Sequence, residues 1–562
     1  RVRGYSPSWT TTNRPICLRE DCADKRYCAL KFVVLGPPSL LHFVDRTRCG
    51  GQYHRALHVR AVAACNMSSG PMQLFLSATN YRVMSVEALR AACADGRTSN
   101  VYYRQTQLQQ LYSTVVQHSP EIEDAIISDT GASRTEARYE LALALRALQT
   151  VSAGLDPKEE LSLEYSLTRS QNAPNARRGV GIVVLRPTQH TLLFSAISPL
   201  CAAIAAGNCV ALYLPKTTST TSGLLQRVLV PALDRDAFMI TDSPSEDDLV
   251  KEATVDVIQE FRSEGRHLAN QVVSTPAALT VAVVDRTANL VTAAKSIVHA
   301  RLAQGGKSPY APDIVLVNEF MREKFLQAVF HVLHSEEDAQ SIQESQTPAA
   351  RKRRSEIKHA ISESQNKSKL RLVSEAEKGV VFEVKDRDHS LMLNKIQDPC
   401  LFVHTVRSLD DAIDFANSGK TLLAGYFFAQ PDAAKYLSQF VEAHVSFVNH
   451  IPPELLVGPA HPLDYAVDPA LRYSPMMFSR PRPSFITSAP ATRNGSAVMP
   501  SHTASIDNLL ATVKSGLPIR QRAKQDTTAF GFFEHALLLH LGLMAALGLG
   551  ATAAAVWAIR RR

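Results

Sequence analysis

Four consecutive residues, Gly305-Gly-Lys-Ser308, have types that surround a phosphate in many nucleotide-binding proteins. The phosphate-binding pattern G-x-x-x-x-G-K-[ST] requires a further glycine before them, and Arg301 occupies that position. The β-branched apolar run that begins at Asp313 is typical of a buried strand. A loop that leads into a strand is the reverse of a phosphate-binding loop, so the sequence excludes this chemistry here.

The nine cysteines are the other candidates for chemistry, as metal ligands or as nucleophiles. Five of them lie in the first 65 residues, namely Cys17, Cys22, Cys28, Cys49 and Cys65. Their spacing includes no C-x-x-C pair and no matching histidine pair, so no metal site is predicted. Residues 1–80 lack clear periodicity and receive no assignment, and the start at Arg1 rather than Met leaves a targeting signal open.

Composition predicts a globular protein of two or three domains, because 562 residues with 45% hydrophobic content can form ordinary cores. The net charge of +8 is a small excess of 61 basic over 53 acidic residues, so no nucleic-acid partner is predicted. The basic run from Arg351 to Arg354 favours a solvated helix face or loop over a localisation signal.

From about residue 81 the pattern becomes that of an α/β protein. Ser133 and Glu136 form a capping box that begins a helix, because each side chain can bond the backbone amide of the other residue. A strand at 179–185, an apolar helix at 192–206 and a strand at 209–214 form a βαβ unit.

Further units of this kind follow. The predicted strands and helices are 279–285, 289–303, 314–317, 319–332, 401–406, 409–417, 424–428, 433–443 and 445–449. Strands that alternate with helices at these lengths predict parallel sheets covered by helices.

The phrase GVGIVVLRPTQHTLLFSAISPLCAAIAAGNCVALYLPK, residues 179–216, is similar to the aldehyde dehydrogenase superfamily, with fungal members that carry a membrane segment as the nearest type. The resemblance continues through DTGAS, STPAALTVAVVD, SPYAPDIVLVNEF, SLDDAIDFANSGKTLLAGYFFAQPDAAKYL and HVSFVNH, over roughly residues 81–475. It implies an aldehyde dehydrogenase-like α/β fold, with a Rossmann-like cofactor domain and an α/β catalytic-type domain.

The implied domain organisation has four parts after the unassigned start. Residues 81–270 form the cofactor-type domain, completed by about 446–475, and residues 271–445 form the catalytic-type domain. Residues 476–531, rich in Pro, Ser, Thr and Arg, are expected to be a flexible linker, and residues 532–562 a transmembrane tail anchor.

The family reaction requires a cysteine thiolate that attacks the aldehyde and a carboxylate that activates water. The resemblance places Ser308 or Pro309 at the thiol position and Asn270 at the carboxylate position. The asparagine that holds the developing oxyanion corresponds to Gln189 or, with a shift of one residue, to His190. The reacting groups of the family are therefore replaced.

The cofactor positions also differ. The resemblance implies NAD or NADP, yet the lysine that binds the adenosine ribose corresponds to Tyr213 or Leu214, and Gln397 lies in the second ribose contact. The phosphate-binding loop is unrecognisable around 260–265. Of the four remaining cysteines, Cys201, Cys209 and Cys400 lie in apolar elements and are predicted to be core residues.

The segment from Ala536 to Ile559 has no charged residue and is long enough to cross a bilayer. Trp557 and the arginines that follow suit an interface, which predicts a single-pass tail anchor with the globular part in the cytosol. The membrane could be that of the endoplasmic reticulum, the mitochondrial outer surface or the peroxisome.

Two routes to a homo-oligomer are open, one through the fold itself and one through the tail. A stripe of small residues in the tail would let two helices approach closely; it comprises Gly542, Ala546, Gly550 and Ala554.

Two hypotheses follow for function. The first is a membrane-anchored protein of aldehyde dehydrogenase fold that has lost catalysis and acts as a scaffold or regulator. The alternative is an active NAD(P)-dependent dehydrogenase that oxidises fatty or other aldehydes to acids at a membrane. Function has to be argued from the site, because one fold supports many activities.

Overall fold

The computed structural model describes residues 86–215, 219–242, 255–260, 270–334, 370–376, 379–387, 389, 392–482, 503–516 and 532–561, with the backbone of four short strands before residue 62. The chain divides into two units, Arg1–Val83 and Met84–Arg562. In the first unit, β1 (Leu41–Val44) pairs with β4 (His58–Ala61), and β2 (Arg48–Cys49) pairs with β3 (Gln52–Tyr53), both antiparallel. The sequence predicted none of these strands.

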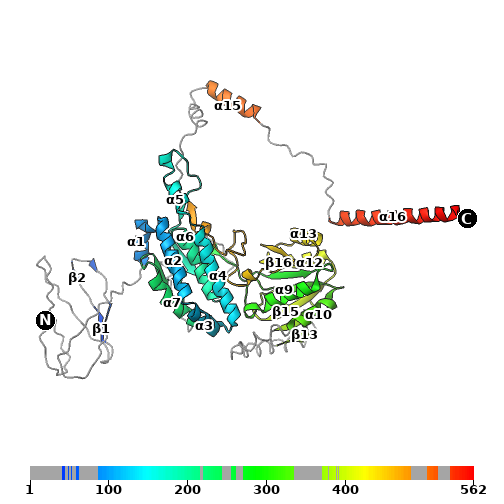
Figure 1. The fold of residues 1–562 in the computed structure, drawn as a ribbon, viewed down its shortest axis with the longest axis horizontal. Helices are drawn as coiled ribbons and strands as arrows, with labels where there is room; N and C mark the ends of the chain where they lie inside the picture. Colours follow the sequence, from blue (N-terminus) through cyan, green and yellow to red (C-terminus); the bar gives the residue numbers. More distant parts are fainter. Residues whose placement is uncertain are drawn as a thin grey trace. The chain divides into compact units, whose positions relative to one another are not determined.

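The second unit contains a parallel five-stranded sheet in the order β10-β9-β6-β7-β8 (Figure 1). Its strands are β6 (Ile182–Arg186), β7 (Cys209–Tyr213), β8 (Phe238–Thr241), β9 (Val255–Ile258) and β10 (Gln271–Val273). The helices of this part are α1 (Val86–Asp95), α2 (Val101–Gln117), α3 (Ser119–Thr130), α4 (Arg134–Ala153), α5 (Pro157–Glu164), α6 (Leu192–Ala205) and α7 (Thr220–Ala232). The predicted βαβ unit is confirmed as β6, α6 and β7.

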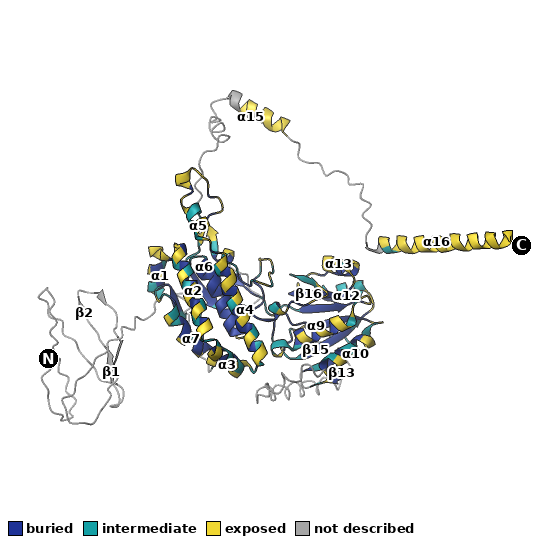
Figure 2. Cartoon of the chain, viewed as in Figure 1, coloured by how far each residue is buried: buried dark blue, intermediate teal, exposed yellow. Residues whose placement is uncertain are grey.

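Helix α4 begins as the capping box predicts. The Ser133 side chain accepts from the Glu136 amide, and the Glu136 side chain accepts from the Ser133 amide. Helix α6 is buried along its whole length, as Figure 2 shows for the core of this part. The turn after α6 is fixed by Gly207, whose φ is +86°, and by Asn208, which bonds Gly181 and Phe478. The C-terminal end of this apolar helix is therefore determined by the two residues of the turn that follows it.

A seven-stranded sheet follows in the order β13-β14-β15-β12-β11-β16-β17. Its strands are β11 (Thr280–Val284), β12 (Ile314–Asn318), β13 (Leu370–Glu375), β14 (Val380–Val384), β15 (Cys400–Val406), β16 (Ala424–Phe428) and β17 (Ser446–Val448). All neighbouring pairs are parallel except β13 with β14.

Alternation along the strands divides the core of this sheet into two faces. Ala282 and Val284 pack with helices α9 (Leu290–Leu302) and α10 (Arg322–Leu333). Val281 and Val283 pack on the other face with α12 (Leu409–Ala416) and α13 (Pro431–Phe440). Successive residues of a strand point to opposite faces, so a continuous apolar run serves both layers of helices.

Helix α10 begins at Arg322 rather than at Glu319, where the sequence placed it. Asn318, the last residue of β12, accepts two hydrogen bonds. Its side chain accepts from the Phe320 amide, and its backbone carbonyl oxygen accepts from the Met321 amide. These bonds form a turn that delays the helix.

Short 3-10 helices complete the folded part, namely η1 (Arg97–Ser99), η2 (Leu167–Arg169), η3 (Ala303–Gly306), η6 (Pro453–Leu456) and η7 (Pro475–Phe478). Within the range predicted as a linker, β18 (Ser479–Pro481) pairs with β5 (Arg177–Gly179), and α15 covers Thr503–Ser515. The basic run from Arg351 to Arg354 lies outside the described residues.

The C-terminal helix α16 spans Phe532–Arg560. Its segment Glu534–Arg560 is 27 residues long with a mean hydropathy of 1.8, and none of the most apolar window is buried. Figure 2 shows the helix exposed along its length. A core helix would be covered and a signal sequence would lie near the N-terminus, so this helix is a candidate membrane span.

Candidate functional site

The loop that carries the nucleophile position follows α9 and leads to β12. Ser308 is completely buried there, and its hydroxyl oxygen accepts a hydrogen bond from the Tyr310 amide at 3.3 Å. Its carbonyl oxygen accepts from the Ala311 amide at 3.1 Å. A hydroxyl needs a base to become a nucleophile, and this buried one instead accepts from a single backbone amide.

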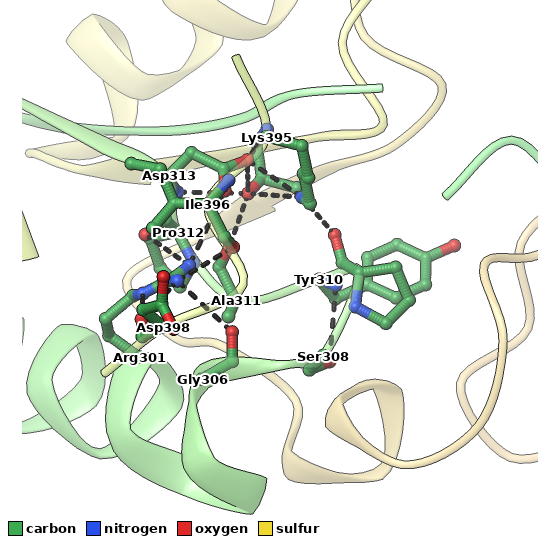
Figure 3. A network of polar contacts seen from close by, with 12 residues as sticks. Arg301, Gly306, Ser308, Tyr310, Ala311, Pro312, Asp313, Lys395, Ile396 and Asp398 are labelled. Atoms are coloured by element: carbon green, nitrogen blue, oxygen red, sulfur yellow. Dashed lines mark hydrogen bonds and ion pairs between the residues drawn. The ribbon is translucent and has the colours of Figure 1, made fainter. Parts of the chain in front are cut away.

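A buried ionic network lies directly beside this loop (Figure 3). At its centre is Asp313, which is fully buried and lies 2.8 Å from the Lys395 ammonium and 3.5 Å from the Arg301 guanidinium. The same carboxylate accepts hydrogen bonds from the Thr280 amide at 2.8 Å and from the Ile396 amide at 3.1 Å. Asp313 is thus held by two cations and two backbone amides.

Arg301 connects two loops through its guanidinium. It donates to the carbonyl oxygens of Gly306 at 3.1 Å, Ile396 at 2.8 Å and Asp398 at 2.6 Å. The loop that contains Ser308 and the loop that contains Gln397 are therefore joined through one buried side chain. Lys395 adds a second connection, because its ammonium also donates to the Pro309 carbonyl oxygen.

The electrostatics of the network are unbalanced. It contains two cationic side chains, Arg301 and Lys395, and one carboxylate, Asp313. Burial lowers the pKa of both cations, and the attraction of Asp313 opposes that shift. Loss of the Asp313 carboxylate would therefore leave the positive charges of both Arg301 and Lys395 without their partner.

Gly306 allows the two loops to approach. Its φ is +75°, and a Cβ atom at this position would lie 2.4 Å from the Asp398 carbonyl oxygen. Any side chain there would collide with backbone and adopt an unfavourable conformation. The second glycine of the pair that first suggested phosphate binding instead allows close packing of the loop.

The oxyanion position lies in the turn between β6 and α6. Gln189 is exposed, and its backbone N–H donates to a Glu260 carboxylate oxygen at 3.2 Å; the Thr188 hydroxyl donates to the same oxygen at 2.5 Å. His190 is partly buried, with its Nε2 3.3 Å from the Leu456 carbonyl oxygen. Of the two alternatives, His190 is the residue that faces the interior.

Burial lowers the pKa of His190 to about 4, and the charges of Lys307 and Arg472 act in the same direction. The imidazole is therefore neutral at physiological pH. The influence of Lys307 places His190 near the nucleophile loop, so the structure brings this turn and the Ser308 loop into one region.

Beneath the same turn lies Glu140 of α4, which is 1% exposed and accepts a hydrogen bond from the Phe194 amide at 3.2 Å. The carboxyl satisfies a free amide in the first turn of α6. Burial raises its pKa to about 7, although the amides of Phe194 and Leu193 favour the charged form. Sequence reasoning missed this residue, although its position on the apolar face of α4, between Ala137 and Ala144, was a signal.

The remaining site residues lie further apart. Asn270 is exposed, and its carbonyl oxygen accepts from the Asp256 amide at 3.0 Å. Among the contacts of the described residues, none joins Asn270 to Ser308. Tyr213 is partly buried at the end of β7, and Gln397 is exposed beside Asp398.

Cys201 is completely buried in α6 and Cys400 is buried at the start of β15. Burial raises the pKa of both thiols, to about 12 and about 11 respectively, so neither is a thiolate at neutral pH. Within the described ranges, no cluster of three or more His, Cys, Asp or Glu side chains is arranged to hold a metal ion.

Comparisons with known proteins match residues 78–457 to the Aldehyde dehydrogenase family. The chain is 27% identical over 375 residues to mouse aldehyde dehydrogenase family 3 member B2, which covers 61% of this chain and 76% of that protein. It is 23% identical over 366 residues to 4,4'-diaponeurosporen-aldehyde dehydrogenase of Staphylococcus aureus, over 60% of this chain and 78% of that protein.

Solved structures agree on the fold. The substrate-bound AldH of Staphylococcus aureus superposes with a TM-score of 0.60 at 17% identity, over 76% of this chain and 98% of that chain. An NAD-dependent benzaldehyde dehydrogenase of Corynebacterium glutamicum superposes with a TM-score of 0.53 at 15% identity, over 72% and 88% of the two chains.

Proposed function

This chain belongs to the aldehyde dehydrogenase family, and from that premise we propose that it is a membrane-anchored member that acts as a scaffold or regulator without the family's dehydrogenase reaction. The observation that carries the proposal is the state of the nucleophile loop. Ser308 is fully buried and hydrogen-bonded to backbone, and the loop is tied down by Arg301 and Lys395. A thiolate attack on an aldehyde requires an accessible sulfur, which this loop does not supply.

The position of the general base supports the same proposal. Asn270 carries an amide, which cannot take a proton from water at neutral pH. Burial raises the pKa of two carboxyls in this part of the chain, and both have partners. Asp256, whose backbone amide bonds the Asn270 carbonyl oxygen, is paired with Arg186 at 3.0 Å. Glu140 accepts a hydrogen bond from the Phe194 amide. The residues at the nucleophile and general-base positions therefore supply neither the thiol that attacks the aldehyde nor the carboxylate that activates water for hydrolysis.

The cofactor positions do not fit a dinucleotide well. Tyr213 offers a phenol where the resemblance implies a lysine. Gln397 can offer an amide, but a neutral amide holds a ribose hydroxyl less strongly than a carboxylate does. We expect affinities for NAD and NADP weaker than about 1 mM, or roughly 4 kcal/mol of binding free energy.

Calorimetric titration of the purified full-length protein in detergent with NAD, and separately with NADP, tests this expectation. Absence of a saturable heat at submillimolar ligand supports the proposal. Micromolar binding of either nucleotide would overturn the cofactor argument and favour the alternative.

The alternative is an active NAD(P)-dependent dehydrogenase that oxidises fatty or other aldehydes to acids at a membrane. The similar proteins from mouse and Staphylococcus aureus are dehydrogenases by name, and several solved neighbours are NAD- or NADP-dependent. The site residues of this chain favour the first proposal, because the chemistry depends on them rather than on the fold.

For the membrane, we propose a single-pass tail anchor formed by α16, with the globular part in the cytosol. The support is the length and hydropathy of Glu534–Arg560 and the stacking of Arg561 over Trp557 at the helix end, with 4.1 Å from guanidinium carbon to ring centre. Full-length protein should resist carbonate extraction from membranes, whereas a chain that ends before Phe532 should be released. Release of both forms would contradict the anchor.

A further inference from the structure

Two cysteines from distant parts of the sequence meet outside the site described above. Cys93 lies in the last turns of α1, and Cys209 is the first residue of β7. Both are free thiols, and Cys93 packs against the small apolar cluster that contains Cys209, Leu89 and Ile182. Cys93 is partly exposed, whereas Cys209 is completely buried.

The two sulfurs have opposite environments. A hydrogen bond with Cys209, followed by the positive charge of Arg480, lowers the pKa of Cys93 to about 6, against the effects of burial and of Asp95. The same hydrogen bond and burial raise the pKa of Cys209. The partly exposed member of the pair therefore has more thiolate character than the buried member.

We propose that Cys93 and Cys209 form a redox-active pair, in which a hydroperoxide oxidises the accessible sulfur and the buried one closes a disulfide between α1 and β7. This arrangement matches the requirements of a thiol sensor, which needs a reactive accessible cysteine and a resolving cysteine in contact with it.

The chemistry balances in two steps. The Cys93 thiolate attacks one oxygen of the hydroperoxide; an S–O bond forms, the O–O bond breaks, and an alcohol leaves after protonation. The Cys209 sulfur then attacks the Cys93 sulfur, so that an S–S bond forms, the S–O bond breaks, and hydroxide leaves with the Cys209 proton as water. The two thiols lose two electrons in total, and the hydroperoxide accepts them.

The disulfide would link the first helix of the second unit to a central strand of the five-stranded sheet. It would close the chain between residues 93 and 209, which includes helices α2 to α6. A link across so long a segment restricts the unfolded chain more than the folded one, so oxidation should stabilise this part of the protein.

The experiment treats purified full-length protein in detergent with hydrogen peroxide, blocks free thiols with iodoacetamide, and digests with trypsin without reduction. Cys93 falls in the tryptic peptide 91–97, and Cys209 falls in the peptide 179–216, which also contains Cys201. We expect these two peptides to appear joined, and reduction to separate them. Oxidised protein should unfold about 5 °C or more above reduced protein.

Matched variants identify the sulfurs. Cys93→Ser and Cys209→Ser should each abolish the joined peptide and the thermal shift, whereas Cys201→Ser should retain both. If Cys209→Ser does not fold, the alkylation rates of the native reduced protein decide, because Cys93 should react many times faster than the buried Cys201. Joining of the 91–97 peptide to any of the first five cysteines, or oxidation of Cys93 to sulfinic acid without a joined product, would overturn the proposal.

Discussion

The buried network beside Ser308 predicts an asymmetry between its members. Replacing Asp313 with Asn keeps the volume but removes the carboxylate that pairs with both Arg301 and Lys395. Removing one partner from a buried ion pair costs about 3–5 kcal/mol, because the remaining charges have no compensation. Replacing Lys395 with Met leaves Asp313 paired with Arg301 and with the backbone amides, and should cost about 1–2 kcal/mol.

Thermal unfolding of the two variants and the wild type, at one pH and in one detergent, tests this asymmetry. At roughly 2 °C per kcal/mol, Asp313→Asn should lower the unfolding temperature by about 6–10 °C and Lys395→Met by about 2–4 °C. Equal losses, or a larger loss for Lys395→Met, would show that the charge imbalance does not control this loop and would refute the reasoning.

Three further predictions follow from single residues. Glu140 has a folded pKa of about 7, above the 4.5 of an ordinary glutamate, so its protonated form favours folding and this stability is lost as the pH rises through 7. At pH 9, the free energy of unfolding of Glu140→Gln should therefore exceed that of the wild type by about 3 kcal/mol, and the variant should unfold at the higher temperature. At pH 5 the two proteins should differ little, and melting curves across that pH range measure both differences. Gly306→Ala should destabilise the protein by about 2 kcal/mol or more, because its Cβ would lie 2.4 Å from the Asp398 carbonyl oxygen, and denaturant unfolding measures the loss. Gly550→Leu should weaken self-association of the tail in a membrane crosslinking assay, whereas Leu549→Ala should not; equal signals would leave α16 as a plain anchor.

The elements that depend on short-range pattern were predictable. The capping box of Ser133 and Glu136 fixes the start of α4, and the apolar run with Gly207 after it fixes α6. These signals lie within a few residues of the structures they specify, so a reader of the sequence has everything that is needed.

The neighbours of the candidate site were not predictable in the same way. Asp313 and Lys395 are 82 residues apart, and their pairing depends on how two loops of one sheet approach each other. Glu136 also makes a contact with a residue far along the chain, in addition to its capping bond. Its other carboxylate oxygen accepts from the backbone N–H of Gln304 at 2.8 Å. The resemblance predicted which residues stand at the positions of the family's reacting groups, but not the contacts that hold the loop in place.

Restoring the family's thiol and carboxylate tests whether this chain lacks only the reacting groups or also a cleft that can hold the aldehyde. The double change Ser308→Cys with Asn270→Glu supplies a thiol and a carboxylate at the two positions. Recovery of aldehyde oxidation in that variant would show that only the reacting groups differ. The tight burial of Ser308 predicts that any recovery will be weak.

The most direct test of the central claim is the formation of reduced nicotinamide by the unmodified protein. Purified full-length protein is incubated with NAD or NADP and with short-chain, aromatic and long-chain aldehydes, alongside a Ser308→Ala variant. The account predicts no reduced nicotinamide from either protein above the rate without enzyme. Turnover by the unmodified protein that Ser308→Ala abolishes would contradict it.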